Sequence, residues 1–429
     1  MLDILKAIAR EGIKFVEKHD FVRIFTHYDP DGITAGAIIA TALIRLGKDF
    51  QVRFLKGLNE EVEYDKDDLV ILSDMGSGYP DVVSKIEADT IVVDHHIPTG
   101  RIEKDNLVHI NPHLAGLDGT YELSASGTAY VFANVLGDNR DLAGIALVGA
   151  IGDKQKMKGG NAEILREGIE SGYIEVKSGL SLHSMKVREA LMLSLEPFLD
   201  FYGKEDELED FLRKVRIDGD KDFEELSDEE MYRLSNAVAL RLLKMNAYTG
   251  VFNDIMRGRI ILKSELIRNA VTMCDVINAC GRVTACSLGF ALCLRDSKYL
   301  NKAFEIWRNY TTELLERINA VRDDVREGFC IRYVIMSDGN AASPIATIFS
   351  RYFYPDKPFI AVSVKGERAK VSARGNDSLK VNLAEVMQKA GEKVGGRGGG
   401  HRVAAGAIIP ADKVEEFISE VDRLCCSQG

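Results

Sequence analysis

Three apolar runs in the first hundred residues each end on an aspartate or a histidine. They are residues 21–26, which lead into His27, residues 69–73, which lead into Asp74, and residues 90–93, which lead into Asp94. Apolar runs of this length between polar residues are typical of buried strands in a parallel sheet. Helical patterns separate the runs, so the sequence predicts an α/β fold with a doubly wound parallel sheet.

The same alternation returns near the end of the chain. Helices are predicted over 2–18, 32–46, 123–136, 142–151 and 343–353, and further strands over 108–110, 331–336, 358–364 and 369–373. Between 161 and 328 the helical period dominates. The sequence therefore predicts a parallel α/β domain over 1–160, a mainly helical insert or linker over 161–328 and a smaller α/β domain over 329–429.

The carboxyl ends of parallel strands share one sheet edge, where α/β folds bind their ligands. The predicted strands bring to this edge His27, Asp29, Asp31, Asp74, Asp94, His95 and His96. A single Asp after a strand is more often a turn residue or a helix cap, but turns do not require adjacent histidines. The sequence therefore predicts a metal site. Carboxylates and imidazoles without cysteine suit Mn²⁺ or Mg²⁺, and so many carboxylates indicate two ions.

Five short motifs in order carry a resemblance to a known family. They are His27-x-Asp29-x-Asp31, Asp74, Asp94-His95-His96, Gly152-Asp153 and, near the end of the chain, Gly398-Gly399-Gly400-His401. The first four resemble the motifs of the DHH phosphoesterase superfamily, and the last resembles the signature of its DHHA1 domain. Within the superfamily the chain most resembles the RecJ-like single-strand exonucleases, particularly the archaeal ones. Enzymes that degrade oligonucleotides or cyclic dinucleotides share the same motifs.

The resemblance implies a role for each matched residue. His27 and Asp29 would hold one ion, Asp31, His95 and Asp153 the other, and Asp74 would bridge the two. Two Mn²⁺ or Mg²⁺ ions per active site are implied. Asp94 would orient one of the metal-ligating imidazoles, and His96 would contact the scissile phosphate or assist the leaving group. Arg374, Gly398, Gly399, Gly400 and His401 would grip the terminal nucleotide.

Charge changes this picture in one respect. The net charge of −11 argues against broad attraction to nucleic acid. Between Lys365 and Arg402, however, nine Lys or Arg face four Asp or Glu, which predicts a local basic patch where the resemblance implies substrate binding. The glycine-rich segment 395–402 is predicted to be a loop whose backbone N–H groups can approach a phosphate.

The seven cysteines include no C-x-x-C pair. Cys274, Cys280, Cys286 and Cys293 recur in an apolar stretch and are predicted to be reduced core thiols, with a cluster-binding site as the alternative. Cys425 and Cys426 are assigned no role. No apolar stretch has the length of a membrane span and the amino terminus lacks the order of a signal peptide, so a cytoplasmic protein without membrane partners is expected.

Three functions fit these observations. The first is an exonuclease that releases mononucleotides from single-stranded DNA or RNA, in replication or repair. The second is a phosphodiesterase for short oligonucleotides or cyclic dinucleotides. The third, again by resemblance, is a mainly structural replisome subunit, with GINS-like replisome proteins as partners. Intact ligands at every motif disfavour the third as a sole role, and the long helical insert favours the first.

Overall fold

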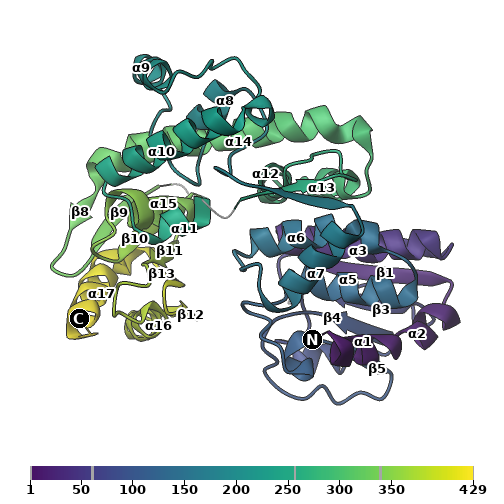
Figure 1. Ribbon diagram of the computed structural model, residues 1–429. Helices are drawn as coiled ribbons and strands as arrows, with labels where there is room; N and C mark the ends of the chain where they lie inside the picture. Colours follow the sequence, from purple (N-terminus) through teal and green to yellow (C-terminus); the bar gives the residue numbers. More distant parts are fainter. Residues whose placement is uncertain (1, 59–61, 256–257, 338–340, 429) are drawn as a thin grey trace. The chain divides into compact units, whose positions relative to one another are not determined.

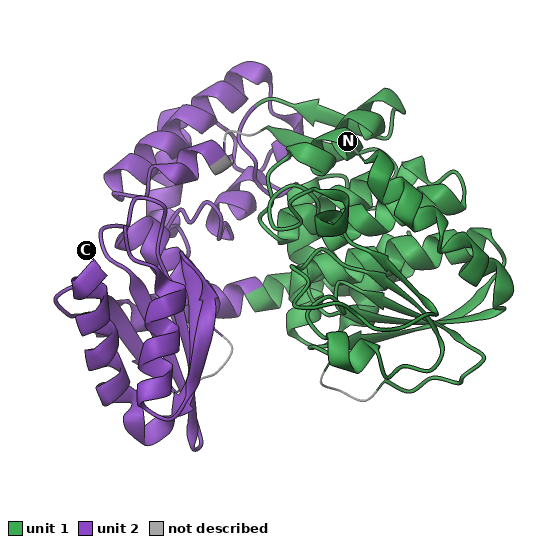
Figure 2. Ribbon diagram, turned by 90° about the horizontal axis from the view of Figure 1, so that it is seen from below, with its two compact units in different colours: residues 1–178, 258–310 green, residues 179–257, 311–429 purple. Residues whose placement is uncertain are grey.

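The computed structural model describes residues 2–58, 62–255, 258–337 and 341–428 (Figure 1). The chain forms two compact units (Figure 2). The first unit comprises residues 1–178 and 258–310, and the second comprises residues 179–257 and 311–429. The segment predicted as an insert, 161–328, thus divides between the two units, and the domain boundaries at 160 and 328 remain a prediction.

The first unit is built on a five-stranded sheet in the order β2-β1-β3-β4-β5 with every pair parallel. The strands are β1 (Phe21–His27), β2 (Asp49–Leu55), β3 (Leu69–Ser73), β4 (Asp89–Val93) and β5 (Leu107–Ile110). β3 and β4 are buried along their whole length, as their continuous apolar runs predicted. The strand order reverses between β1 and β3, and ligands of open α/β sheets bind at such a point, beyond the carboxyl ends of the strands.

Helices surround this sheet and contribute site residues of their own. They are α1 (Asp3–Arg10), α2 (Ile13–Lys18), α3 (Pro30–Arg45), α4 (Pro80–Val83), α5 (Ala125–Leu136), α6 (Ala143–Gly152), α7 (Gly159–Glu170), α12 (Ala270–Arg282), α13 (Cys286–Cys293) and the start of α14 (Leu300–Val321). The single helix predicted over 2–18 is two helices, separated by Glu11 and Gly12. Gly12 packs closely against its neighbours, since a Cβ there would lie 3.0 Å from the Phe132 ring. Gly47 follows α3 at φ +69°, the left-handed conformation in which glycine commonly ends a helix.

The second unit carries a six-stranded sheet in the order β12-β13-β11-β10-β9-β8. Its strands are β8 (Arg326–Glu327), β9 (Arg332–Met336), β10 (Phe359–Lys365), β11 (Arg368–Arg374), β12 (Arg397–His401) and β13 (Ala404–Pro410). Only β9 and β10 pair in parallel. The helices are α8 (Val187–Met192), α9 (Glu205–Val215), α10 (Asp228–Lys244), α11 (Gly250–Ile255), α15 (Ala342–Ile348), α16 (Leu383–Lys393) and α17 (Val414–Gln428). The predicted α/β class is confirmed for both ends of the chain.

One sequence prediction about this part of the chain is wrong. The glycine-rich segment expected as a loop contains β12, an edge strand paired antiparallel to β13. Glycine permits this strand because a Cβ on Gly398 would lie 2.1 Å from the Met387 carbonyl oxygen of α16. The segment 161–328 is mainly helical and contains one antiparallel strand pair, β6 (Ile174–Lys177) with β7 (Arg259–Leu262), which belongs to the first unit.

The cysteines separate into two sets. Cys274, Cys280, Cys286 and Cys293 are buried free thiols, as predicted, and they contribute to none of the potential metal-binding groups among the described residues. Cys426 is not incidental, because it forms a disulfide with Cys330. Over the described residues, no helix combines the length and hydrophobicity that crossing a bilayer requires.

Candidate metal centre

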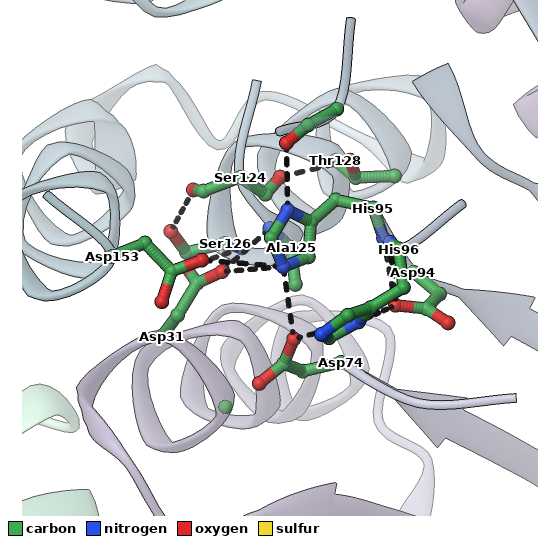
Figure 3. A network of polar contacts seen from close by, with 12 residues as sticks. Asp31, Asp74, Asp94, His95, His96, Ser124, Ala125, Ser126, Thr128 and Asp153 are labelled. Carbon is green, nitrogen blue, oxygen red and sulfur yellow. Dashed lines mark hydrogen bonds and ion pairs between the residues drawn. The ribbon is translucent and has the colours of Figure 1, made fainter. Parts of the chain in front are cut away.

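The predicted ligands of the first unit meet at the carboxyl edge of its sheet. Figure 3 shows Asp31, Asp74, His95 and Asp153 of this cluster, with Asp94 and His96 beside them. His27 ends β1, Asp74 follows β3, and Asp94 to His96 follow β4. Two helices bring the remaining carboxylates, because Asp31 lies in the first turn of α3 and Asp153 follows α6. Asp29 caps α3 by accepting the N–H of Gly32 at 3.0 Å.

The first ligand group consists of His27, Asp29 and Asp74, whose ligand atoms lie within 4.8 Å of one another. His27 Nδ1 lies 2.9 Å from Asp29 Oδ2 and 3.5 Å from Asp74 Oδ2. Burial alone lowers the pKa of His27, but the two carboxylates outweigh it and raise this pKa to about 11.

The second ligand group consists of Asp31, His95 and Asp153. His95 Nε2 lies 3.2 Å from Asp153 Oδ2 and 3.8 Å from Asp31 Oδ2. Burial raises the pKa of Asp31 to about 6, assisted by the charge of Asp74, and burial also raises the pKa of Asp153. Carboxylates packed this closely away from water repel one another, so a divalent cation would stabilise their ionised forms.

Asp74 faces both groups. Its Oδ2 is directed at His27, whereas its Oδ1 lies 3.4 Å from His95 Nε2. This Oδ1 is buried and receives no hydrogen bond. Asp74 also has φ +56°, a sparsely populated conformation for a residue other than glycine. A buried oxygen without a hydrogen bond, in a carboxylate that faces an imidazole on each side, fits a shared cation ligand. The oxygen and nitrogen donors of the whole cluster suit Mn²⁺ or Mg²⁺.

Backbone N–H groups orient Asp31 from the start of another helix. Its two oxygens accept the N–H groups of Ala125 at 2.7 Å and Ser126 at 2.9 Å, at the amino end of α5. Gly149 of α6 packs against the same carboxylate, because a Cβ there would lie 2.4 Å from Asp31 Oδ1 and 2.1 Å from Ser126 Oγ. Asp31 is therefore fixed by contacts that its own motif does not contain.

The orientation of His95 depends on a second buried chain of hydrogen bonds. His95 Nδ1 lies 2.8 Å from the carbonyl oxygen of Gly119. Gln155 Nε2 donates to the same oxygen at 2.7 Å, and Asn161 Nδ2 donates to Gln155 Oε1 at 2.8 Å. The Nε2 atom of His95 is thereby directed at the carboxylates of the second group.

His96 is held differently, with 57% of its side chain exposed. Asp94 Oδ1 lies 2.8 Å from His96 Nδ1 and also accepts the N–H groups of His95 and His96. Asn111 Nδ2 donates both to the His96 carbonyl oxygen at 2.9 Å and to Ser77 Oγ at 2.8 Å, and the N–H of Ser77 donates to Asp94 Oδ2. Asp94 thus orients His96, whereas the ring of the predicted ligand His95 faces the Gly119 carbonyl oxygen and not Asp94.

Sequence reasoning missed the supporting residues Ser77, Asn111, Gly119, Gln155 and Asn161. The hydrogen bond from Asn111 to His96 joins residues 15 positions apart, and that from Gln155 to Gly119 joins residues 36 positions apart. No local sequence pattern therefore marks these residues. Only Asn111 carries a usable signal, because it directly follows β5 in the way that Asp74 and Asp94 follow their strands.

The predicted substrate residues lie together on the sheet of the second unit. Arg374 and His401 both pair with Ala404, so all three belong to one row across β11, β13 and β12. Directly paired residues project from the same face, so Arg374 and His401 share a face. Two positions along each strand, and therefore on the same face, Gly399 pairs with Gly406, and a Cβ on Gly399 would meet nothing within 4 Å. This row of the sheet presents backbone without side chains.

Arg374 is largely desolvated, which lowers the pKa of its guanidinium. Its nitrogens donate to Ser343 Oγ at 2.7 Å and to the carbonyl oxygens of Ala373 and Ala405. Among the described carboxylates none forms an ion pair with it, whereas Arg402 pairs with Asp377 at 2.9 Å. A desolvated guanidinium without a carboxylate favours an anionic ligand.

The comparisons with known proteins agree with both units. Residues 21–150 match the model of the DHH family, N-terminal domain, and residues 330–426 match the DHHA1 domain. The uncharacterized protein MJ0831 of Methanocaldococcus jannaschii is 30% identical over 449 residues, which cover 100% of this chain and 99% of that relative.

Solved structures share the fold at low sequence identity. Thermus thermophilus RecJ in complex with Mn²⁺ gives a TM-score of 0.63 at 16% identity, and the match covers 98% of this chain and 55% of RecJ. CDC45 from Entamoeba histolytica gives 0.64 at 13% identity and covers 97% of each chain. This chain therefore spans about half the length of the Thermus RecJ, and the predicted RecJ-like arrangement of the fold is confirmed.

Proposed function

The chain belongs to the DHH family, and from that membership we propose that it is a metal-dependent phosphodiesterase, a RecJ-like exonuclease that releases mononucleotides from single-stranded DNA or RNA. The observation that carries the proposal is the pair of three-residue ligand groups joined by Asp74. We also propose that the protein acts in DNA replication or repair in the cytoplasm, with GINS-like replisome proteins as candidate partners and no membrane partner.

The ligand assignment follows the two groups. His27 and Asp29 would hold one ion, Asp31, His95 and Asp153 the other, and Asp74 would bridge them. Two bound Mn²⁺ or Mg²⁺ ions supply a water made nucleophilic at neutral pH and polarise the phosphodiester. The protein keeps His95 in the tautomer that presents Nε2, and holds Asp31 with two backbone N–H groups.

His96 is assigned to the scissile phosphate or the leaving oxygen. Its Nδ1 faces Asp94, which leaves Nε2 as the atom available to a ligand. The hydrogen bond to Asp94 raises the pKa of His96, so the imidazolium form that can donate from Nε2 is favoured. Its partial exposure allows contact with a bound strand, whereas the buried His95 is suited to a ligand role.

The second unit would hold the terminal nucleotide. Arg374 and His401 would contact phosphate, and Gly398, Gly399 and Gly400 would let the backbone approach it. The uncompensated guanidinium of Arg374 and the local excess of positive charge between Lys365 and Arg402 support this assignment.

The alternatives are a phosphodiesterase for oligonucleotides or cyclic dinucleotides and a mainly structural replisome subunit. All can be separated by incubating end-labelled single-stranded DNA and RNA, blunt duplex and a cyclic dinucleotide with the protein and Mn²⁺, Mg²⁺ or a chelator. We expect metal-dependent release of mononucleotides from single strands, with slower digestion of duplex. Turnover of the cyclic dinucleotide alone would favour the second function, and metal-loaded protein without any hydrolysis would favour the third. Full activity after exhaustive chelation would overturn the metal mechanism.

A further inference from the structure

Two loops of the first unit lie side by side next to the second ligand group. They are residues 118–122 and residues 154–158, which directly follow the ligand Asp153 and lead into α7. Gln155 donates to the Gly119 carbonyl oxygen at 2.7 Å, and the N–H of Asn161 donates to the Glu122 carbonyl oxygen at 2.8 Å. Because Gly119 also receives His95 Nδ1, both loops are attached to a ligand of the candidate metal centre.

The outer side of these loops carries one aromatic ring and several lysines. Tyr121 is 56% exposed. Gln155 is buried between its neighbours, so Lys154 and Lys156 flank it on the exposed side, and Lys158 is exposed two positions further on. Neither Lys156 nor Lys158 forms an ion pair with a described carboxylate, although the protein as a whole is acidic.

The carboxylates of the same loops are turned toward their own backbone. Asp118 Oδ1 accepts the N–H of Thr120 at 2.8 Å, and Glu122 Oε2 accepts the N–H of Asp118 at 3.4 Å. They still reduce the local positive charge, so phosphate contacts here depend on individual lysines. An exposed aromatic beside unpaired lysines is the combination with which proteins bind single strands, by base stacking and by phosphate contacts.

We propose, on the basis of the function proposed above, that Tyr121, Lys156 and Lys158 form a subsite for the nucleotides beyond the scissile phosphate. Tyr121 stacks on a base, and the two lysines contact successive phosphates. The subsite makes a strand of several nucleotides, instead of a dinucleotide, the preferred substrate of the metal centre.

The test compares kcat/KM for a ten-nucleotide single strand with kcat/KM for a dinucleotide, using the full chain in Mn²⁺. Lys156→Ala with Lys158→Ala, and separately Tyr121→Ala, should each lower the ratio of ten-mer to dinucleotide about tenfold, mainly through KM of the ten-mer. The double lysine variant should also reduce the slope of log affinity against log salt by about 1.4, or about 0.7 per lysine.

Two matched variants separate the subsite from nonspecific effects. Lys14→Ala with Lys85→Ala removes the same charge from exposed positions outside both loops, in α2 and before β4, and should keep the wild-type ratio. Tyr121→Phe keeps the aromatic ring and should also keep the wild-type ratio. An unchanged ratio in the Lys156 and Lys158 variant, or an equal loss with both substrates, would overturn the subsite.

Binding measurements keep this test independent of the proposed exonuclease activity. Fluorescence anisotropy with a chelator present measures the affinity for the ten-mer and the dinucleotide without cleavage. If the wild-type protein cleaves no strand, the proposed function fails. The subsite still stands if the wild-type protein prefers the ten-mer and the double lysine variant loses that preference, and it fails if the wild-type protein binds both equally.

Discussion

The imidazole of His95 lies with Nδ1 2.8 Å from the carbonyl oxygen of Gly119, and this hydrogen bond decides which ring nitrogen faces the carboxylates. A carbonyl oxygen can only accept, so Nδ1 carries the proton and Nε2 is left for a cation. Metal-bound histidines in proteins are commonly held in this way by an outer hydrogen bond. The position of Gly119 is set in turn by the side chain of Gln155.

Replacing Gln155 with methionine should therefore weaken Mn²⁺ binding about 10- to 100-fold, the usual effect of losing such a supporting contact. The substitution keeps the side chain's length but removes the donor to the Gly119 carbonyl oxygen. Calorimetric titration with Mn²⁺ measures the effect. Gln388→Met, on the exposed face of α16 in the second unit, is the matched control and should bind as the wild type does. Equal affinities in both variants would contradict the role of Gln155.

Gly149→Ala should lower both stability and metal-dependent activity. The added methyl group would lie 2.4 Å from Asp31 Oδ1 and 2.1 Å from Ser126 Oγ, so α5 and α6 must move apart and Asp31 must shift. Overpacking of this kind costs about 1–3 kcal/mol, which exceeds the gain of about 1 kcal/mol from alanine in a helix. Thermal denaturation and hydrolysis assays check the two effects.

Gly144→Ala is the control for that substitution, because it lies in the same helix. Its Cβ would meet the end of the Leu262 side chain at 3.0 Å, and this chain end can move. We expect near-wild-type stability and activity for Gly144→Ala. If Gly149→Ala behaved in the same way, the packing of α6 against Asp31 would not limit the metal centre.

The residues that sequence reasoning found share one property, which is a position in a local pattern. His27, Asp74 and Asp94 end or follow apolar runs, and the sheet topology then brings them together. The contacts that fix them are not local. Asp31 receives N–H groups from residues 94 and 95 positions away, and nothing in the sequence around Ala125 announces them.

Sequence patterns also gave the wrong secondary structure where strand pairing outweighed the local amino-acid composition. Gly398, Gly399 and Gly400 suggested a loop, but their partners Ala405 to Ala407 on β13 supply the hydrogen bonds of an edge strand. The disulfide between Cys330 and Cys426 joins residues separated by 96 positions, so only the folded unit reveals the pair. The division of the helical segment 161–328 between two units has the same origin, because long-range contacts decide it.

The two units should make different contributions to hydrolysis and to binding. Asp31→Ala should abolish cleavage but keep much of the affinity for single strands, because removing a carboxylate lowers the negative potential near the phosphates. Arg374→Ala with His401→Ala should weaken binding about 10- to 100-fold, as expected for the loss of charged hydrogen bonds, and its defect should lessen at high substrate concentration. Binding isotherms at one fixed salt concentration compare the variants. If Asp31→Ala lost binding as completely as the double variant, the metals would be the main anchor.

Mn²⁺ affinity should rise with pH throughout the neutral range. The sequence alone suggests weakening only below about pH 6.5, the ordinary pKa of histidine. In the folded cluster, Asp29 and Asp74 raise the pKa of His27 to about 11, so the ion-free protein holds a proton there at pH 7 that a cation must displace. Protonation competes with metal binding, so the affinity falls as pH is lowered through the whole range below about 11.

The expected slope is about tenfold in affinity per pH unit for each displaced proton. It should steepen below pH 6, because burial and the charge of Asp74 raise the pKa of Asp31 to about 6 and add a further competing proton there, besides those on His27 and His95, whose pKa values neighbouring carboxylates raise. Calorimetric titrations at several pH values, each in two buffers of different ionisation enthalpy, measure the affinity and the number of protons released. An affinity that is constant from pH 6 to pH 9, with no proton release, would show that the cation displaces no proton from His27 and that His27 is not a ligand.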